Sequence, residues 1–349
     1  MSDKHIAPGQ GTNRRNLLKL SATATAFGLG VLGTGGFHFT PAIAQTGSLA
    51  KPAPIKIAWS QTAVCHSPLS VAFERGFFEQ YNLQVEPISF TGATDQFLQA
   101  IATGHADGGI GMALRWLKPL EQGFDVGLAV GTHGGCMRLL TTKDSGVTSI
   151  ADLKGKRVAV SDQASPIRNF FAIRAAEQGI DPDTEIEWLQ YPADLFAEAL
   201  AKGEVDAIAG DDPHAYLQRE NDGLLEIGTN LDDEYLNTTC CVLGLRGSLI
   251  REQPDVAAAI TRAVVEAQAW TAANPDESAR IFAPHIPSGI PAETVSAILR
   301  EHTHNHHSTG ETLRKDVELW LGKLQAIGVI RQGTDLPAFA AKVVPDVLV

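Results

Sequence analysis

Hydrophobic positions along the chain alternate between two spacings from residue 55 onward. Continuous apolar runs at Ile55–Ser60 and Leu83–Ile88 predict buried strands. A helix is predicted between them, because apolar side chains recur there at the spacing of one helical face: Leu69, Ala72, Phe73, Phe77 and Tyr81. Such alternation is typical of an α/β domain with a largely parallel sheet.

The same alternation continues through two rounds. The first adds two helices and two strands at Thr94–Thr103, Gly108–Gly111, Leu114–Gln122 and Asp125–Val130. The second comprises strands and helices at Lys156–Val160, Ser165–Gly179, Glu185–Leu189, Ala193–Lys202 and Val205–Ala209.

Two short motifs recur between these rounds. Ser67-Pro68 returns as Ser165-Pro166, and AIATGHAD (Ala100–Asp107) returns as ALAKGEVD (Ala199–Asp206). Both offsets are close to one domain length, and the motifs keep their order and their place among the predicted strands and helices. The repeat predicts two lobes of like topology.

The pattern changes after Gly223. Thr238–Leu245 predicts a returning strand, and Pro254–Ala273 predicts a long helix followed by a mostly helical remainder. We expect these helices to pack back on the first lobe, so that the chain crosses between lobes near Gly135–Leu140 and near Thr238–Leu243. The expected division is residues 45–138 for the first part of lobe one, 139–240 for lobe two, and 241–349 for the return and the C-terminal helices.

The N-terminal segment has the layout of an export signal. Paired arginines at Arg14-Arg15 precede a mildly hydrophobic run from Ala22 to Gly36, and small residues follow at 42–44. A membrane anchor that stays attached is the alternative, but glycines break the run and it is short for a span. We expect a twin-arginine-type signal peptide, residues 1–44, cleaved after Ala44.

The charge balance narrows the range of partners. Residues 1–44 carry four basic residues and one acidic residue, so their removal changes the net charge from −12 to −15. An acidic chain is a poor partner for nucleic acid or for an anionic membrane. No later segment is apolar enough to cross a bilayer, so we expect the chain in the periplasm without stable membrane insertion. A monomer is also expected.

Several segments together resemble a known family. WSQTAVCHSPLSVAFERGFFEQYNLQVE and IATGHADGGIG in the first half, with SIADLKGKRVAV and LAKGEVDAIAGDDP in the second, are similar to the periplasmic substrate-binding proteins of ABC importers for nitrate, sulfonate, taurine and thiamine-pyrimidine compounds. The resemblance covers nearly all of the chain after residue 44. It implies a periplasmic-binding-protein type II fold, an inner-membrane ABC permease as partner, and a small-molecule ligand in a cleft between the lobes.

The cleft residues follow from where the predicted strands end. Ligands of open α/β sheets bind beyond the carboxyl ends of the strands, and helix N-termini there favour a negative group. Ser67 and Ser165 are also expected to cap their helices. The candidate ligand-binding residues other than cysteine are Gln61, Thr62, His66, Thr91, Gly92, Ser161, Asp162, Gln163, Ser165 and Asp211.

The four cysteines, Cys65, Cys136, Cys240 and Cys241, all fall on predicted cleft or crossover segments. Three interpretations stay open: small buried side chains or a disulfide, a soft-metal site, or a redox role for the adjacent pair. The metal would be copper, zinc or an iron–sulfur centre, and His66, His133 or Met137 could assist the thiolates. The cysteines are therefore both candidate ligand contacts and candidate metal ligands.

A histidine cluster at His302–His307 is the other metal-like feature. His302 and His306 would lie one helical turn apart if a helix from Thr294 continued through them. The alternative is a hydrated helix end.

No enzyme motif is evident. The chain has no G-x-S-x-G elbow, phosphate-binding loop, dinucleotide fingerprint or HExxH helix. Cys65-His66 supplies a nucleophile and a base, but chain neighbours rarely form a working pair. The expected function is capture of a small anionic or zwitterionic solute for an ABC importer, without catalysis. The alternative is a metal- or cofactor-binding protein on the same scaffold, with a redox or chaperone role.

Overall fold

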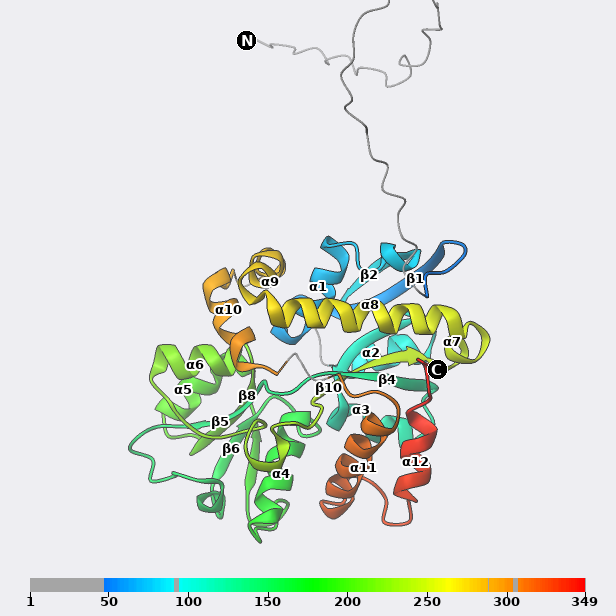
Figure 1. Ribbon diagram of the computed structural model, residues 1–349. Coiled ribbons are helices and arrows are strands. Elements are labelled where there is room, and N and C mark those ends of the chain that lie inside the picture. Colours follow the sequence, from blue (N-terminus) through cyan, green and yellow to red (C-terminus); the bar gives the residue numbers. More distant parts are fainter. Residues whose placement is uncertain (1–46, 91–93, 288, 304–306, 349) are drawn as a thin grey trace, which may run out of the picture. The chain divides into compact units, whose positions relative to one another are not determined.

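The computed structural model describes residues 47–90, 94–287, 289–303 and 307–348 (Figure 1). All of them belong to one compact unit, Ala44–Val349. The expected signal segment and its cleavage site lie outside the described residues. Within the described part, every helix is too short or too polar to cross a membrane.

The first sheet has the strand order β2-β1-β3-β10-β4. β3, inside the sheet, and β4, at one edge, are buried along their whole length, whereas β2, at the other edge, is largely exposed or half-buried. β1 pairs in parallel with β2 and β3, while β10 runs antiparallel to β3 and β4. The five strands are β1 (Ala53–Ser60), β2 (Leu83–Phe90), β3 (Gly108–Met112), β4 (Val126–His133) and β10 (Cys241–Arg246).

The second sheet repeats this arrangement with the order β7-β6-β8-β5-β9. β6 is parallel to β7 and β8, and β5 is antiparallel to β8 and β9. Two lobes of like topology are therefore confirmed, but each sheet is mixed rather than largely parallel, because β10 and β5 each enter their sheet from the other lobe. The strands are β5 (Met137–Thr141), β6 (Arg157–Val160), β7 (Glu187–Gln190), β8 (Ala207–Asp211) and β9 (Leu225–Thr229).

The sequence repeat corresponds to one structural device used twice. Asp107 accepts a hydrogen bond from the backbone N–H of Lys56 in β1 at 2.8 Å, and Asp206 accepts one from the N–H of Arg157 in β6 at 2.9 Å. Each carboxylate follows a helix that ends near a glycine with positive φ, the conformation that glycine adopts without steric cost. The motif thus sets the register at the start of both sheets.

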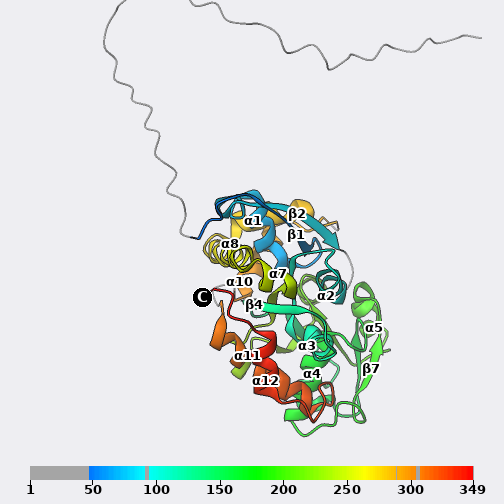
Figure 2. The same ribbon diagram turned by 90° about the vertical axis from the view of Figure 1, so that its right-hand side faces the viewer.

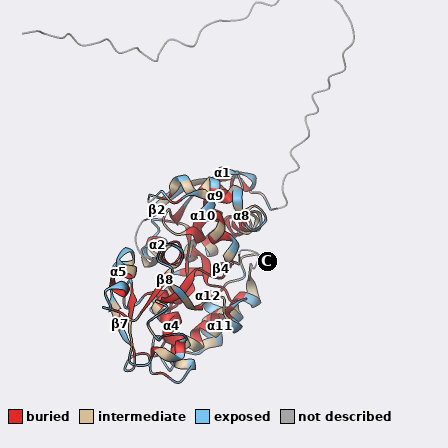
Figure 3. Ribbon diagram, turned by 90° about the vertical axis from the view of Figure 1, so that its left-hand side faces the viewer, coloured by how far each residue is buried: buried red, intermediate tan, exposed pale blue. Residues whose placement is uncertain are grey.

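Helices cover both sheets and leave the central strands in the buried interior (Figure 3). α4 and α6 contact β5 and β8 of the second sheet. Within the described residues the α-helices are α1 (Ser67–Glu74), α2 (Thr94–Ala102), α3 (Ala113–Glu121), α4 (Pro166–Glu177), α5 (Phe196–Ala201), α6 (His214–Asp222), α7 (Gly247–Glu252), α8 (Pro254–Ala273), α9 (Pro275–Phe282), α10 (Ala292–Glu301), α11 (Gly310–Ala326) and α12 (Leu336–Val343).

The C-terminal helices return to the first lobe, as the sequence predicts. α8 contacts α1, β2 and β4, α9 contacts α1, and both α11 and α12 contact β4. α8 crosses beside β1 and β2 in both views (Figures 1 and 2). α11 also contacts α4, so one C-terminal helix touches both lobes.

Candidate functional site

A cavity of about 450 Å³ lies between elements of the two sheets. Its wall from the first lobe comes from the ends of β1 and β3 and the starts of α1 and α3. Its wall from the second lobe comes from the ends of β6 and β8 and the starts of α4 and α6. The lining residues are Ser60, Thr62, Ala63, Cys65, His66, Phe97, Gly111, Met112, Arg115, Ser161, Asp162, Ser165, Pro166, Ile167, Ala193, Asp211, Asp212, Pro213, His214 and Cys241.

Eight of the residues expected from the sequence line this cavity: Thr62, Cys65, His66, Ser161, Asp162, Ser165, Asp211 and Cys241. Gln61, Gln163, Cys136 and Cys240 are not part of its lining. The amide of Gln163 instead donates to the carbonyl of Trp188 at 2.9 Å. Thr91 and Gly92 lie outside the described residues.

Sequence reasoning missed Ser60, Arg115 and His214 among the polar lining residues. Arg115 lies in α3, which follows β3 directly, and His214 begins α6, which starts shortly after β8 ends. The rule that placed the other residues, that ligands meet the ends of strands, would also have selected these positions.

The two Ser-Pro helix starts differ in detail. Ser165 is the N-cap of α4, and its Oγ accepts the N–H of Arg168 at 3.0 Å, as predicted. Ser67 is instead the first residue of α1, whose N-cap is His66, so the prediction that Ser67 caps its helix is wrong. The buried Oγ of Ser67 has no hydrogen-bond partner among the described residues.

Arg115 connects the lobes beside the cavity. Its Nη1 lies 2.9 Å from Oδ1 of Asp162 and also donates to the carbonyl of Ala164, both in the loop that follows β6. Its Nη2 lies 3.4 Å from Asp95 of α2. Because these two carboxylates compensate the charge of Arg115, the arginine forms an ionic bridge between the lobes.

The cysteines converge at one side of the cavity. The ligand atoms of Cys65, His133 and Cys241 all lie within 4.8 Å of one another, and all three residues are buried. Cys136 Sγ lies 3.8 Å from Cys240 Sγ. All four cysteines are free thiols in this structure.

Mutual contacts shift the pKa values of this group. Cys241 and His133 hold the pKa of the Cys65 thiol well below its ordinary value, although burial opposes the shift. Burial likewise opposes protonation of His133, yet its contact with Cys65 raises the pKa of His133 to about 9. The pKa of Asp211, across the cavity, rises to about 7 through burial and the nearby Cys65.

The two histidines proposed as helpers have different surroundings. His66 Nδ1 accepts the backbone N–H of Ser60 at 3.1 Å, and its ring packs against Phe97 with centroids 5.5 Å apart. Among the described residues, the group with metal-ligand spacing therefore contains His133 and does not contain His66. The carboxylates of Asp211 and Asp212 are not members of that group either.

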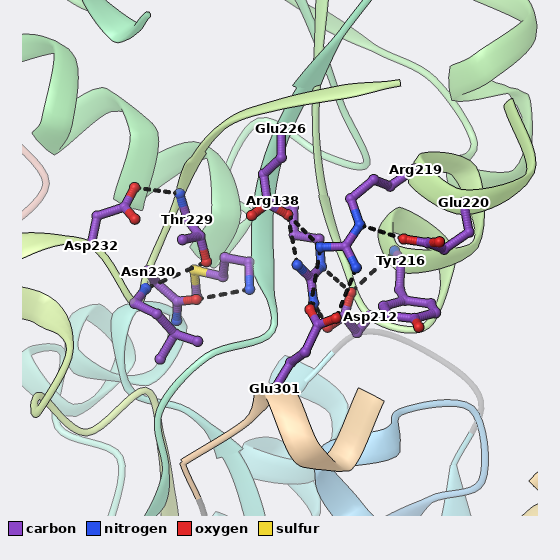
Figure 4. Close-up of polar contacts among 12 residues, drawn as sticks. Arg138, Asp212, Tyr216, Arg219, Glu220, Glu226, Thr229, Asn230, Asp232 and Glu301 are labelled. Atoms are coloured by element: carbon purple, nitrogen blue, oxygen red, sulfur yellow. Dashed lines mark hydrogen bonds and ion pairs between the residues drawn. The ribbon is translucent and has the colours of Figure 1, made fainter. Parts of the chain in front are cut away.

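An ion network lies next to the cavity (Figure 4). Arg138 of β5 makes a bidentate contact with Asp212, at 2.8 and 2.9 Å. The same guanidinium reaches Glu226 at 2.6 Å and Glu301 at 2.7 Å. Arg219 of α6 binds both glutamates from the outer side. Glu301 is the last residue of α10, so the network joins a C-terminal helix to the second lobe.

His302 is not part of a hydrated helix end. α10 ends at Glu301, so the helix does not continue toward His306, which lies outside the described residues. His302 is buried, and its Nε2 lies 2.9 Å from Oδ2 of Asp212. Its ring stacks on His133, with centroids 5.3 Å apart. The prediction that His302 and His306 chelate a metal from one helix is therefore wrong, because the helix ends at Glu301 and the His302 side chain contacts Asp212 in the ion network.

Comparison with known proteins identifies the family. Residues 63–278 match the model of the family described as "NMT1/THI5 like", which is more than half of the chain. This chain belongs to the NMT1/THI5-like family. The expected resemblance is therefore confirmed, and the matched region includes every cavity residue except Ser60 and Thr62.

Curated relatives of this NMT1/THI5-like chain are distant. A putative binding protein of Brucella abortus is 25% identical over 247 residues, which covers 70% of this chain and 74% of the relative. The bicarbonate-binding protein CmpA of Synechococcus elongatus is 25% identical over 270 residues, covering 67% of this chain and 58% of CmpA.

Solved structures share the fold. The periplasmic aliphatic sulphonate binding protein SsuA from Escherichia coli superimposes with a TM-score of 0.70 at 19% identity, over 82% of this chain and 91% of SsuA. The periplasmic nitrate-binding protein NrtA from Synechocystis gives 0.68 at 16% identity, over 85% and 87%. The two-lobe periplasmic-binding-protein fold is therefore confirmed.

Proposed function

We propose that this chain is the solute-binding component of an ABC importer, exported to the periplasm by the twin-arginine route. It holds a small anionic or zwitterionic solute in the cavity between the lobes and delivers it to an inner-membrane permease. It acts as a monomer and performs no reaction on the solute. The lobes comprise residues 45–138 with 241–349, and residues 139–240.

The observation that carries this proposal is the convergence of helix N-termini on the cavity. Ser67 begins α1 in one lobe, and Pro166 begins α4 in the other. The cavity is lined by His66, which precedes Ser67, and by Pro166. Unpaired N–H groups and the helix dipole make such ends favourable for a negative group. Two of them facing one cavity favour a carboxylate, a sulfonate or a smaller oxyanion.

A zwitterion would also find a partner for its positive group. Asp211 lies on the cavity wall, and its pKa of about 7 allows it to ionise when a cation is bound beside it. The printed names of the relatives, which refer to bicarbonate, sulphonate and nitrate, support a small anion as the ligand class.

The experiment is a binding screen with a blocked cavity as reference. Purified protein is titrated by calorimetry and followed by melting against bicarbonate, nitrate, alkanesulfonates, taurine and aminopyrimidines. We expect one of these to bind at one site per chain. Ala63→Trp projects a large side chain into the cavity and should abolish that binding, whereas Ala341→Trp, at an exposed position of α12, should leave it unchanged. Equal binding by the Ala63→Trp variant would refute the cavity as the site.

A further inference from the structure

Three ligating side chains meet at the cavity wall from three separate parts of the sequence. Cys65 lies in the turn Val64–His66 before α1, His133 ends β4, and Cys241 begins β10. His133 and Cys241 are paired in the register of β4 and β10, so the sheet holds these two residues opposite each other. Rigid elements thus fix two of the three side chains, which is what a metal site requires.

The spacing fits a metal ion with little movement. Bonds of about 2.3 Å to sulfur and about 2.0 Å to nitrogen place tetrahedral ligand atoms roughly 3.5–3.8 Å apart, and a wider angle separates them further. The three atoms here already lie within 4.8 Å of one another without an ion. Small rotamer changes would therefore complete the geometry.

The donor set also decides the class of metal. Two thiolates and an imidazole are soft ligands that select zinc(II) or copper(I) over magnesium or calcium. Two thiolates balance the charge of zinc(II), which matters because all three side chains are buried. Cys65 and Cys241 line the cavity, so the cavity provides both an entry path and a fourth coordination position.

We propose that Cys65, His133 and Cys241 bind one thiophilic metal ion, zinc(II) or copper(I), at the wall of the cavity. This site does not depend on the proposed transport function. Cys136 and Cys240, whose sulfurs lie 3.8 Å apart, do not belong to the group with metal-ligand spacing. The fourth position of the metal faces the cavity, where a solute with a Lewis-basic atom could occupy it.

The test uses the untagged full chain, because a histidine tag would supply ligands of its own. Zinc(II) and copper(I) are each titrated in competition with a chromogenic chelator under reducing conditions. We expect one ion per chain. Cys65→Ser and Cys241→Ser should each weaken binding by more than about 100-fold, since even indirect partners of a metal contribute 10–100-fold. Cys136→Ser is the matched control and should bind like the wild type.

A second measurement uses only the wild-type protein, so its result does not depend on whether the variants fold. The X-ray absorption spectrum of the metal-loaded wild type should show two sulfur neighbours together with nitrogen. A shell of oxygen and nitrogen alone would overturn the proposal. So would failure of both metals to compete with the chelator, unchanged binding by the two serine variants, or a disulfide that contains Cys65 or Cys241 in protein purified under native conditions.

Discussion

Arg138 is the residue whose loss should most clearly test the ion network. Its side chain is 5% exposed and that of Asp212 is 0% exposed. Arg138→Met keeps much of the volume but removes the two charged hydrogen bonds to Asp212. Arg219 still reaches Glu226 and Glu301. Asp212 is therefore the group left with an incompletely compensated buried charge.

The magnitude follows from that burial. Removal of one partner of a buried ion pair costs about 3–5 kcal/mol. For a unit of this size, about 2 °C of melting temperature is lost per kcal/mol, so the variant should melt about 6–10 °C lower at pH 7. Arg157→Met is the control, because Arg157 and Asp206 are 37% and 28% exposed and their pair is solvated. It should lose much less.

The loss should also depend on pH. Burial opposes ionisation of Asp212, but His302 and Arg138 outweigh it and hold its pKa below the ordinary value. A lowered carboxyl pKa stabilises the fold above the unfolded pKa of about 3.9, and this contribution disappears as pH falls through the folded pKa. The difference between wild type and variant should therefore narrow below about pH 4.

Urea denaturation at pH 7 and at about pH 3, with calorimetry, measures both effects. Asp212→Asn added to Arg138→Met should recover part of the loss, because it removes the stranded carboxylate. A loss under about 1 kcal/mol at pH 7, or a loss that is the same at both pH values, would refute the reasoning.

Three further results are expected. Ser165→Ala should lower the free energy of unfolding in urea by about 1 kcal/mol, because the helix cap is lost. Ser67→Ala should leave it unchanged or raise it, because the Ser67 hydroxyl is buried without a partner among the described residues. Equal losses in the two variants would contradict the assignment of the caps. Gly109→Ala should lower the free energy of unfolding by about 1–3 kcal/mol, since the new Cβ would lie 2.8 Å from a backbone oxygen of β1. Gly333→Ala is the control: its Cβ meets open space, so its loss should be much smaller. Asp211→Asn should raise the melting temperature of metal- and ligand-free protein at pH 8 but not at pH 4. The reason is that a carboxyl group whose folded pKa is raised to about 7 destabilises the fold as pH rises above the unfolded pKa. A higher melting temperature at pH 4 as well would contradict this reasoning.

The architecture could be predicted because its signals are local. The apolar run of β1, the start of α8 at Pro254 and the repeated motifs all occupy a few consecutive residues. Two strands, β5 and β9, could not be predicted in this way. Each has only five residues, and the sequence pattern did not distinguish β5 from a crossover segment or β9 from a loop. Their pairing depends on partners far away in the sequence, and no local pattern reports that.

The candidate site could be predicted only as far as strand ends and segments. That the cysteines would gather was foreseeable from the crossovers, but the choice of His133 over His66 was not. Both are histidines beside a cysteine-bearing segment, and only the pairing of β4 with β10 places His133 opposite Cys241. His302 was misjudged for a similar reason, because its partner Asp212 is 90 residues away.

The position of β10 has a consequence for how the chain folds during synthesis. The second sheet is built from a continuous stretch, residues 137–229, and can form while later residues are still being made. The first sheet needs β10 between β3 and β4, so it stays open until Arg246 has left the ribosome. We expect nascent chains that have emerged from the ribosome as far as about residue 235 to protect the second sheet from protease and to leave the first four strands cleavable. The middle of the sequence, rather than its beginning, would then be the first part to become native.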